Sequence, residues 1–118
     1  MDFSLAREQR ALKETARAFS MLEIEPRAQA IDKAARMPDD LLPKLASAGL
    51  LGLALPPVYG GKGLGHLACI LALEELAYSG TGAWWLAGFN NSISACLAHY
   101  GSEEAKRRFI PPSCAGTA

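Results

Sequence analysis

The apolar and polar positions along the chain follow the pattern of consecutive amphipathic helices. In the first, an apolar stripe with 3.6-residue periodicity lies opposite a face that carries Arg7, Arg10 and Glu14. The stripe consists of Leu5, Leu12, Ala16 and Phe19. We therefore expect a helix that Ser4 caps and that extends to about Ile24.

Two shorter helices are predicted next. Pro26 suits the first turn of a helix that reaches about Arg36, because a proline in that turn loses no hydrogen bond. A third helix is expected to open at Pro38 or Asp39 and to end before Gly49, since glycine commonly follows a helix C-terminus. Its buried stripe would be Leu41, Leu45 and Ala48.

The stretch Leu41–Gly65 holds six of the eleven glycines and three of the seven prolines, so we expect the chain to turn back there. Gly60 and Gly65 have the spacing of the first two glycines of a phosphate-binding P-loop. The Lys-Ser/Thr pair of that motif does not follow them, and no βαβ pattern surrounds them. A turn with positive φ is therefore the favoured interpretation, with the ring of Tyr59 anchoring it by packing.

Beyond this corner, two helices are apolar on nearly all sides. We expect one over about His66–Ser79 and another that Thr81 caps and that reaches Tyr100, with Gly80 between them. A helix without a polar face is normally buried, so these two helices should form the central pair.

A short last helix is predicted after Ser102, a favourable N-cap, and Pro111 and Pro112 are expected to end it. The remaining residues, 113–118, are small and polar and should fray. Because no strand pattern of any length occurs, the sequence predicts a single all-α domain over residues 1–118, an antiparallel bundle of about six helices.

Composition narrows the possible partners. Basic and acidic residues number 12 each, and this zero net charge argues against nucleic acid or an anionic membrane surface. The three cysteines lie far apart without metal-ligand spacing, which indicates neither a metal site nor a disulfide framework and fits a cytoplasmic protein. The uncharged stretch Leu76–Ala98 is long enough to cross a bilayer. Asparagines, serines and glycines interrupt it, so we expect no membrane span.

Few residues suggest chemistry by their type alone. Glu74 and Glu75 look like paired carboxylates, but adjacent helical residues project about 100° apart, so they should not act on one target. Glu74 shares an apolar face, which makes it either a functional acid or base or the partner of an arginine; the ion pair is favoured. His66 and His99 are expected at helix ends, without a catalytic role.

Two tryptophans, Trp84 and Trp85, open the fifth predicted helix. Gly88, Asn91 and Ala95 lie on the side of Trp84, and a large aromatic residue followed by small residues can leave a groove for an apolar ligand. The alternative is a packing groove that a neighbouring helix fills, which the sequence alone favours.

The chain also carries a series of motifs in a fixed order: LAREQRALKETARAF, EPRAQAID, LLPKLASAGLLGLALPPVYGGKGLG, LALEELAY and GSEEAKRRFIPP. This series resembles the N-terminal helical domain of the acyl-CoA dehydrogenases. The resemblance covers roughly Phe3–Gly116, and the glycine- and proline-rich corner is its most specific part.

The resemblance implies a three-domain flavoenzyme, dimeric or tetrameric, that oxidises an acyl-CoA to its 2,3-enoyl form. In that family a glutamate base removes the Cα proton, FAD accepts a hydride from Cβ, and an electron-transfer flavoprotein receives the electrons. The resemblance also implies that the helix after LEELAY forms one wall of the acyl pocket, which maps onto Trp84, Trp85, Gly88 and Asn91. Two tryptophans there would restrict the pocket to a short, branched or unusual acyl group.

The chain departs from the family pattern because it stops where the β-domain would begin. No residue matches the catalytic glutamate, and we assign no catalytic, FAD-binding or metal-binding residue. We therefore expect this domain to bind no FAD and to be inactive alone, while supplying the acyl-pocket wall and oligomer surface of a larger flavoenzyme. Two alternatives remain open. One is a stand-alone helical module that self-associates through exposed apolar surface, and the other is the equivalent domain of a related flavin oxidase or hydroxylase.

Overall fold

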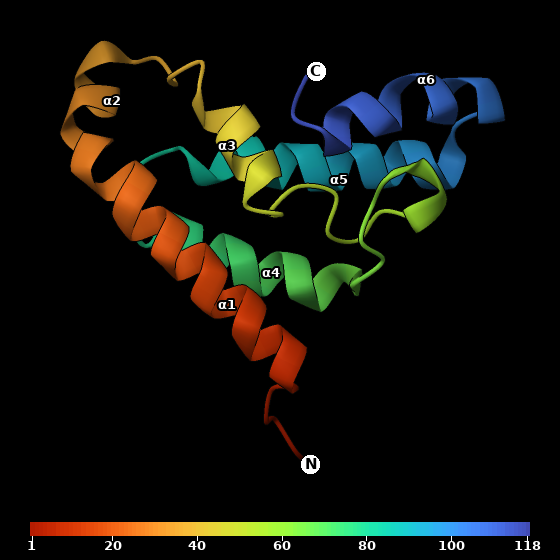
Figure 1. The fold of residues 1–118 in the computed structure, drawn as a ribbon, viewed down its shortest axis with the longest axis horizontal. Helices are drawn as coiled ribbons and strands as arrows, with labels where there is room; N and C mark the ends of the chain where they lie inside the picture. The colour runs from red at the N-terminus through yellow and green to blue at the C-terminus, as the bar shows by residue number, and fades with distance from the viewer.

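The computed structural model describes all 118 residues, and its regular elements are all helices, without a strand, so the predicted all-α fold is confirmed. Its α-helices are α1 (Arg7–Phe19), α2 (Ala28–Ala34), α3 (Leu41–Ser47), α4 (Gly65–Ala77), α5 (Trp84–Tyr100) and α6 (Glu103–Cys114). They form a slab with extents of 41, 40 and 20 Å. In Figure 1, α1 and α4 lie side by side, and α5 runs between α4 and α6.

The first helix continues beyond α1 through a π-helical turn, Ser20–Ile24, and a 3₁₀ turn, Glu25–Arg27, into α2. The predicted helical stretch to Ile24 is therefore present, with a change of pitch before Pro26, whose ring cannot follow a regular α-helix interior. Ser4 is not the N-cap. Ala6 holds that position, and the side chain of Gln9 accepts a hydrogen bond from its backbone N–H at 2.9 Å.

The main core lies where α1, α3, α4 and α5 meet the corner between α3 and α4. Its large buried side chains include Phe19, Ile24, Leu41, Leu45, Leu50, Leu53 and Leu76. A smaller cluster of Leu55, Tyr59 and Ile110 joins the corner to α6, so the predicted packing of the Tyr59 ring is confirmed. The Tyr59 hydroxyl also donates a hydrogen bond to Glu103 Oε1 at 2.7 Å.

The corner is a loop, buried over residues 50–53 and at Leu55, whose two halves fold onto each other. The backbone N–H of Gly63 donates to the carbonyl of Leu55 at 2.9 Å, and that of Leu64 donates to the carbonyl of Leu53 at 2.7 Å. A Cβ added at Gly61 would collide with the Leu55 carbonyl group, so only glycine fits there. Because these amides are used inside the corner, they do not form a phosphate cradle.

The expectations for α6 and the tail are wrong. The helix passes through Pro111 and Pro112 and ends at Cys114. The two prolines lack the N–H groups of a regular helix, but contacts of α6 with the rest of the chain offset this loss. Ile110 is fully buried, and the side-chain amide of Asn90 on α5 donates a hydrogen bond to the Ser113 carbonyl at 2.8 Å. The tail packs instead of fraying, with Gly116 buried against α3.

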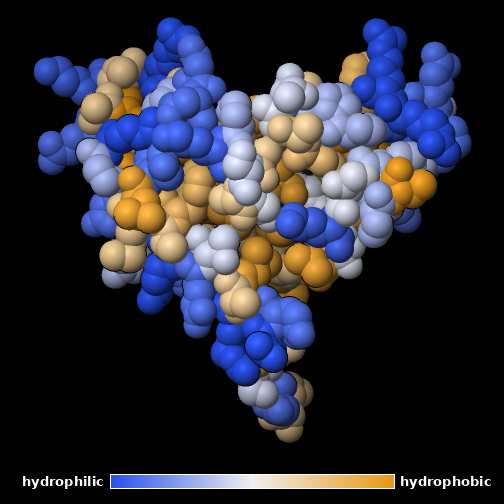
Figure 2. Space-filling view, viewed as in Figure 1, coloured by the Kyte–Doolittle hydropathy of each residue, from blue (hydrophilic) through white to orange (hydrophobic).

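The prediction that α4 and α5 are buried on all sides is also wrong. Leu67 and Ile70 of α4 are exposed, as are Phe89 and Ile93 of α5, because only one side of each helix faces the core. Hydrophobic residues accordingly reach the surface across the middle of the face in Figure 2. None of the helices combines the length and the apolar character that crossing a membrane requires.

Candidate functional site

The candidate site is built on α5, the longest helix of the fold. The turn before it is held by Thr81, whose hydroxyl oxygen accepts a hydrogen bond from the backbone N–H of Ala83 at 3.1 Å. This bond closes a separate turn, so α5 begins at Trp84 and Thr81 is not its N-cap. The two tryptophans therefore occupy the first turn of the helix.

Three aromatic rings stack along the start of α5. The ring centroids of Trp84 and Trp85 are 4.3 Å apart, and those of Trp85 and Phe89 are 4.6 Å apart, with an interplanar angle of 27° in both pairs. Trp84 packs against the main core, whereas Trp85 and Phe89 are exposed. The stack therefore leads from the core to the surface.

The predicted pocket residues do not share one surface. Trp84 and Gly88 do lie together, because a Cβ added at Gly88 would stand 3.7 Å from the Trp84 ring and 3.7 Å from Leu73 of α4. Trp85 lies farther round the helix and lines a different surface, a groove described below. The contact of these residues with an acyl chain stays a prediction.

Asn91 has a structural position that sequence reasoning missed. Its side chain is buried; its Nδ2 donates to the carbonyl oxygens of Ala87 at 2.9 Å and of Leu50 at 3.3 Å. Its Oδ1 accepts a hydrogen bond from the backbone N–H of Leu53 at 2.7 Å. Asn91 thus ties α5 to the corner, and asparagine within a mostly apolar helix was the available indication.

A groove of 570 Å³ opens along the outer side of α5. Trp85, Leu86, Phe89, Asn90, Ile93 and Ser94 of α5 line it, with Met37, Leu42, Gly82, Ser113 and Ala118. No charged side chain is among them. Of the four predicted pocket residues, only Trp85 reaches this groove.

The buried carboxylate of the chain is Glu75, and Glu74 is exposed. Glu75 is only 4% exposed and lies 2.7 Å from Arg17 Nε and 3.3 Å from Lys13 Nζ. Glu74 is 63% exposed and lies 2.8 Å from the same Lys13 nitrogen. The favoured ion pair is therefore present, but its partner is a lysine. The long Lys13 side chain reaches both carboxylates, although one is exposed and the other buried.

The environment of Glu75 favours a structural role. Burial raises the pKa of this carboxyl, but hydrogen bonds from Arg17 and Lys13 outweigh it, so the pKa lies below its ordinary value of 4.5. An ionised carboxylate held by two cations is a poor general base, since its oxygens are already engaged.

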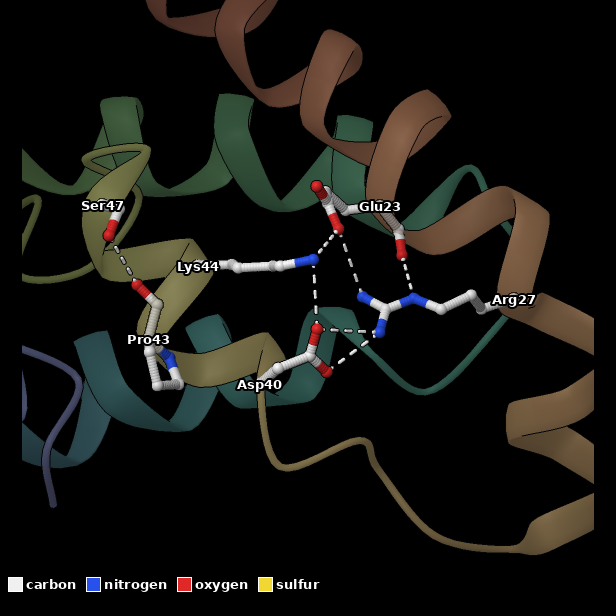
Figure 3. Close-up of polar contacts among 6 residues, drawn as sticks. All are labelled: Glu23, Arg27, Asp40, Pro43, Lys44 and Ser47. Atoms are coloured by element: carbon white, nitrogen blue, oxygen red, sulfur yellow. Dashed lines mark hydrogen bonds and ion pairs between the residues drawn. The ribbon is translucent and has the colours of Figure 1, made fainter.

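A second charged cluster clamps the π-helical turn to α3 (Figure 3). Lys44 Nζ lies 2.6 Å from Glu23 Oε2 and 3.1 Å from Asp40 Oδ2, and the Arg27 guanidinium donates to Asp40 at 2.9 Å. Hydrogen bonds from Lys44 and Arg27 lower the pKa of Asp40. Every charge in this cluster faces an opposite charge, so its function is to join two elements.

The two histidines, distant in sequence, line one cleft of 480 Å³. His66 at the start of α4 and His99 near the end of α5 meet there with Cys96 and Tyr100. The chain contains no group of three or more side chains placed to hold a metal ion.

Comparison with known proteins places this geometry in a family. The model of the acyl-CoA dehydrogenase N-terminal domain matches residues 6–117. The chain is 34% identical over 111 residues to an acryloyl-CoA reductase (NADH) of Anaerotignum propionicum, covering 94% of this chain and 28% of that protein. It is 32% identical over 117 residues to a short-chain-specific acyl-CoA dehydrogenase of Clostridium acetobutylicum, covering 98% of this chain and 31% of that enzyme.

A solved structure shows the same fold. The glutaryl-CoA dehydrogenase of Mycobacterium smegmatis, in complex with FADH2, superposes with a TM-score of 0.89 at 28% identity, covering 97% of this chain and 30% of that one. The chain thus spans less than a third of the length of these relatives. A family match over nearly every residue and a shared fold lead to one conclusion: the chain belongs to the acyl-CoA dehydrogenase N-terminal domain family.

Proposed function

We propose that this chain serves as the N-terminal domain of an FAD-dependent enzyme that dehydrogenates acyl-CoA, and that α5 supplies part of the acyl-pocket wall. The observation that carries the proposal is the family match over residues 6–117. FAD would accept the hydride, and an electron-transfer flavoprotein would take the electrons onward. Oligomer contacts would also use this domain.

The start of α5 supports a short or branched acyl group. Trp84 fills volume beside Gly88, which has no side chain of its own. Two relatives are named for short acyl groups, the acryloyl-CoA reductase and the short-chain-specific dehydrogenase. We assign no FAD contact to this chain and expect it to be inactive alone.

A chimera tests the proposal. This chain would replace the matching segment of the Clostridium acetobutylicum enzyme, and FAD reduction would be followed with butyryl-CoA and octanoyl-CoA. We expect the chimera to reduce FAD with butyryl-CoA, Gly88→Leu to lower kcat/KM by at least tenfold, and Trp84→Ala to favour octanoyl-CoA. Unchanged chain-length preference in both variants of a folded, FAD-loaded chimera would overturn the pocket assignment. FAD reduction by the 118-residue chain alone would overturn its expected inactivity.

Self-association is a second candidate function, supported by the exposed apolar side chains of α4 and α5. Leu67 and Ile70 on one helix and Phe89 and Ile93 on the other face away from the core. Light scattering across a hundredfold concentration range should show a rising mass. A strict monomer at every concentration would eliminate this candidate.

A further inference from the structure

The cleft between the start of α4 and the end of α5 brings a thiol and two imidazoles together, and it includes none of the rings of the aromatic stack. Cys96 and His99 line it from α5, and His66 lines it from α4. Residues three apart on an α-helix share a face, with about 5–6 Å between their Cβ atoms, so Cys96 and His99 are neighbours. A nucleophilic side chain and a proton acceptor therefore lie side by side in this cleft.

The thiol of this cleft is also the accessible one of the chain. Cys96 is exposed, whereas Cys69 is buried and Cys114 is half-buried. Burial raises the pKa of the Cys69 and Cys114 thiols, which disfavours the reactive thiolate at both. The ring of His99 stands edge-on to that of Tyr100, with 4.7 Å between the ring centroids, and both residues line the cleft. An electrophile that reacts with a thiol of the folded chain should therefore react here.

The proposed function supplies an electrophile of the right kind. Dehydrogenation of an acyl-CoA yields a 2,3-enoyl thioester, whose Cβ is open to attack by a thiolate. No acidic side chain lines the cleft, so nothing in its lining repels the phosphate groups of CoA. Its volume of 480 Å³ falls within the range of pockets for small molecules, roughly 300–1,000 Å³.

We propose that this cleft is a site of covalent modification, in which Cys96 adds to a 2,3-enoyl thioester; the choice of reagent rests on the proposed function. The imidazole of His99 accepts the thiol proton, and the sulfur attacks Cβ. A C–S bond forms as the C=C π bond breaks, and the proton passes from the imidazole to Cα. The product is a saturated thioether that keeps its CoA thioester, so the step needs no oxidant and releases no group.

Intact-mass spectrometry of the 118-residue chain with crotonyl-CoA at pH 7.5 tests the proposal. We expect one adduct with the mass of the whole crotonyl-CoA molecule, which peptide mapping assigns to Cys96. Butyryl-CoA, the matched saturated thioester, should add nothing, and Cys96→Ser should abolish the adduct. An adduct that holds only the crotonyl group, or one on Cys69 or Cys114 of the folded chain, would overturn the proposal.

The role of His99 has a matched control in the same cleft. His99→Gln should slow the addition about tenfold or more, since it removes the proton acceptor. Imidazole added to the solution should restore part of the rate, which it would not do if His99 only supported the helix. Ser92→Ala removes another side chain that lines the cleft and should leave the rate unchanged. Equal rates in the two variants would contradict the proposed proton transfer.

This experiment needs neither FAD nor dehydrogenation, because the enoyl thioester is supplied directly. A chimera that reduces FAD with butyryl-CoA while Cys96 stays unmodified by crotonyl-CoA would overturn this inference and leave the proposed function standing. An adduct on Cys96 in a chimera that cannot reduce FAD would support the modification and contradict the proposed function.

Discussion

At the scale of single residues, polar side chains inside apolar helices decide which helix face turns inward. Asn91 satisfies the backbone of the corner from within α5, and Glu75 anchors α4 to two cations of α1. Both residues are buried, although each lies in a mostly apolar helix. Their burial is stable because every hydrogen-bonding atom on their side chains has a partner.

Replacing Asn91 tests the first of these contacts. Asn91→Leu keeps the volume but leaves the Leu53 N–H and the Leu50 carbonyl without this partner. We expect the free energy of unfolding to fall by about 2–4 kcal/mol, measured by urea denaturation. Ser92→Ala, one residue along and exposed, should change it by less than about 0.5 kcal/mol. Equal losses of unfolding free energy in the two variants would show that the hydrogen bonds of Asn91 do not stabilise the fold.

The pKa of Glu75 predicts a pH dependence of stability. Because its folded pKa lies below the unfolded value of 4.5, the unfolded state binds more protons at acid pH. The contribution of Glu75 is fully present above about pH 5.5 and is lost as the pH falls through the folded pKa. At pH 7, Glu75→Gln should lower the free energy of unfolding by about 3 kcal/mol and flatten its decline between pH 5 and pH 3.

The neighbouring residue is the control for that prediction. Glu74 is exposed, so Glu74→Gln should keep both the stability and most of the acid decline of the original chain. Urea denaturation at several pH values measures both variants. If Glu74→Gln flattened the profile as strongly as Glu75→Gln, the buried pair would not be the source of the dependence.

At the scale of elements, the corner fixes how α4 and α5 enter the core. Its apolar half is buried, and its glycine-rich half supplies the hydrogen bonds that this buried backbone needs. The charged clamp of Glu23, Arg27, Asp40 and Lys44 then holds α3 against the π-helical and 3₁₀ turns that follow α1. These two devices place the start of α5, and with it the aromatic stack, relative to the rest of the molecule.

Two glycine-to-alanine substitutions distinguish the cost of a steric collision in the corner from the cost of a positive φ. Gly61→Ala should destabilise the chain by more than about 3 kcal/mol, because the new Cβ meets the backbone of Leu55. Gly80 lies between α4 and α5, and a Cβ added there would contact nothing. Gly80→Ala should therefore cost only the strain of an alanine at a φ of 76°, about 1 kcal/mol. Circular dichroism during thermal unfolding measures both, and a Gly61→Ala variant as stable as Gly80→Ala would contradict the proposed collision.

At the scale of the whole molecule, the three cysteines report on the packing of the slab. Cys96 is exposed on α5, Cys69 is buried in the main core, and Cys114 is half-buried at the end of α6. Burial raises the pKa of the Cys69 and Cys114 thiols, so both stay protonated at neutral pH.

Thiol labelling of the native chain at pH 7.5 should therefore show one fast-reacting group, because only the thiolate of an accessible cysteine attacks the reagent. Counting reacted groups with a chromogenic disulfide reagent measures this, and denaturant should expose the other two. Cys96→Ser should remove the fast phase and leave the slow phase unchanged. A fast phase that persisted in this variant would show that the core opens more readily than the structure implies.

The sequence by itself determined what depends on neighbouring residues. Helix positions followed from periodicity, the Ser102 cap accepts the Ala105 N–H as predicted, and Gly49 adopts the positive φ expected after a helix. The motif series identified the family, since spacing between motifs is a property of the chain alone.

Only the tertiary structure decided what depends on contacts between distant segments. In the folded chain Glu75 is buried and Glu74 is exposed. The helix α6 continues through two prolines, and one side of α5 remains open as a groove. When a helix is apolar on nearly every side, its sequence does not indicate which side will be buried. The neighbours that pack against the helix, here α1 against α4 and the corner against α5, make that choice.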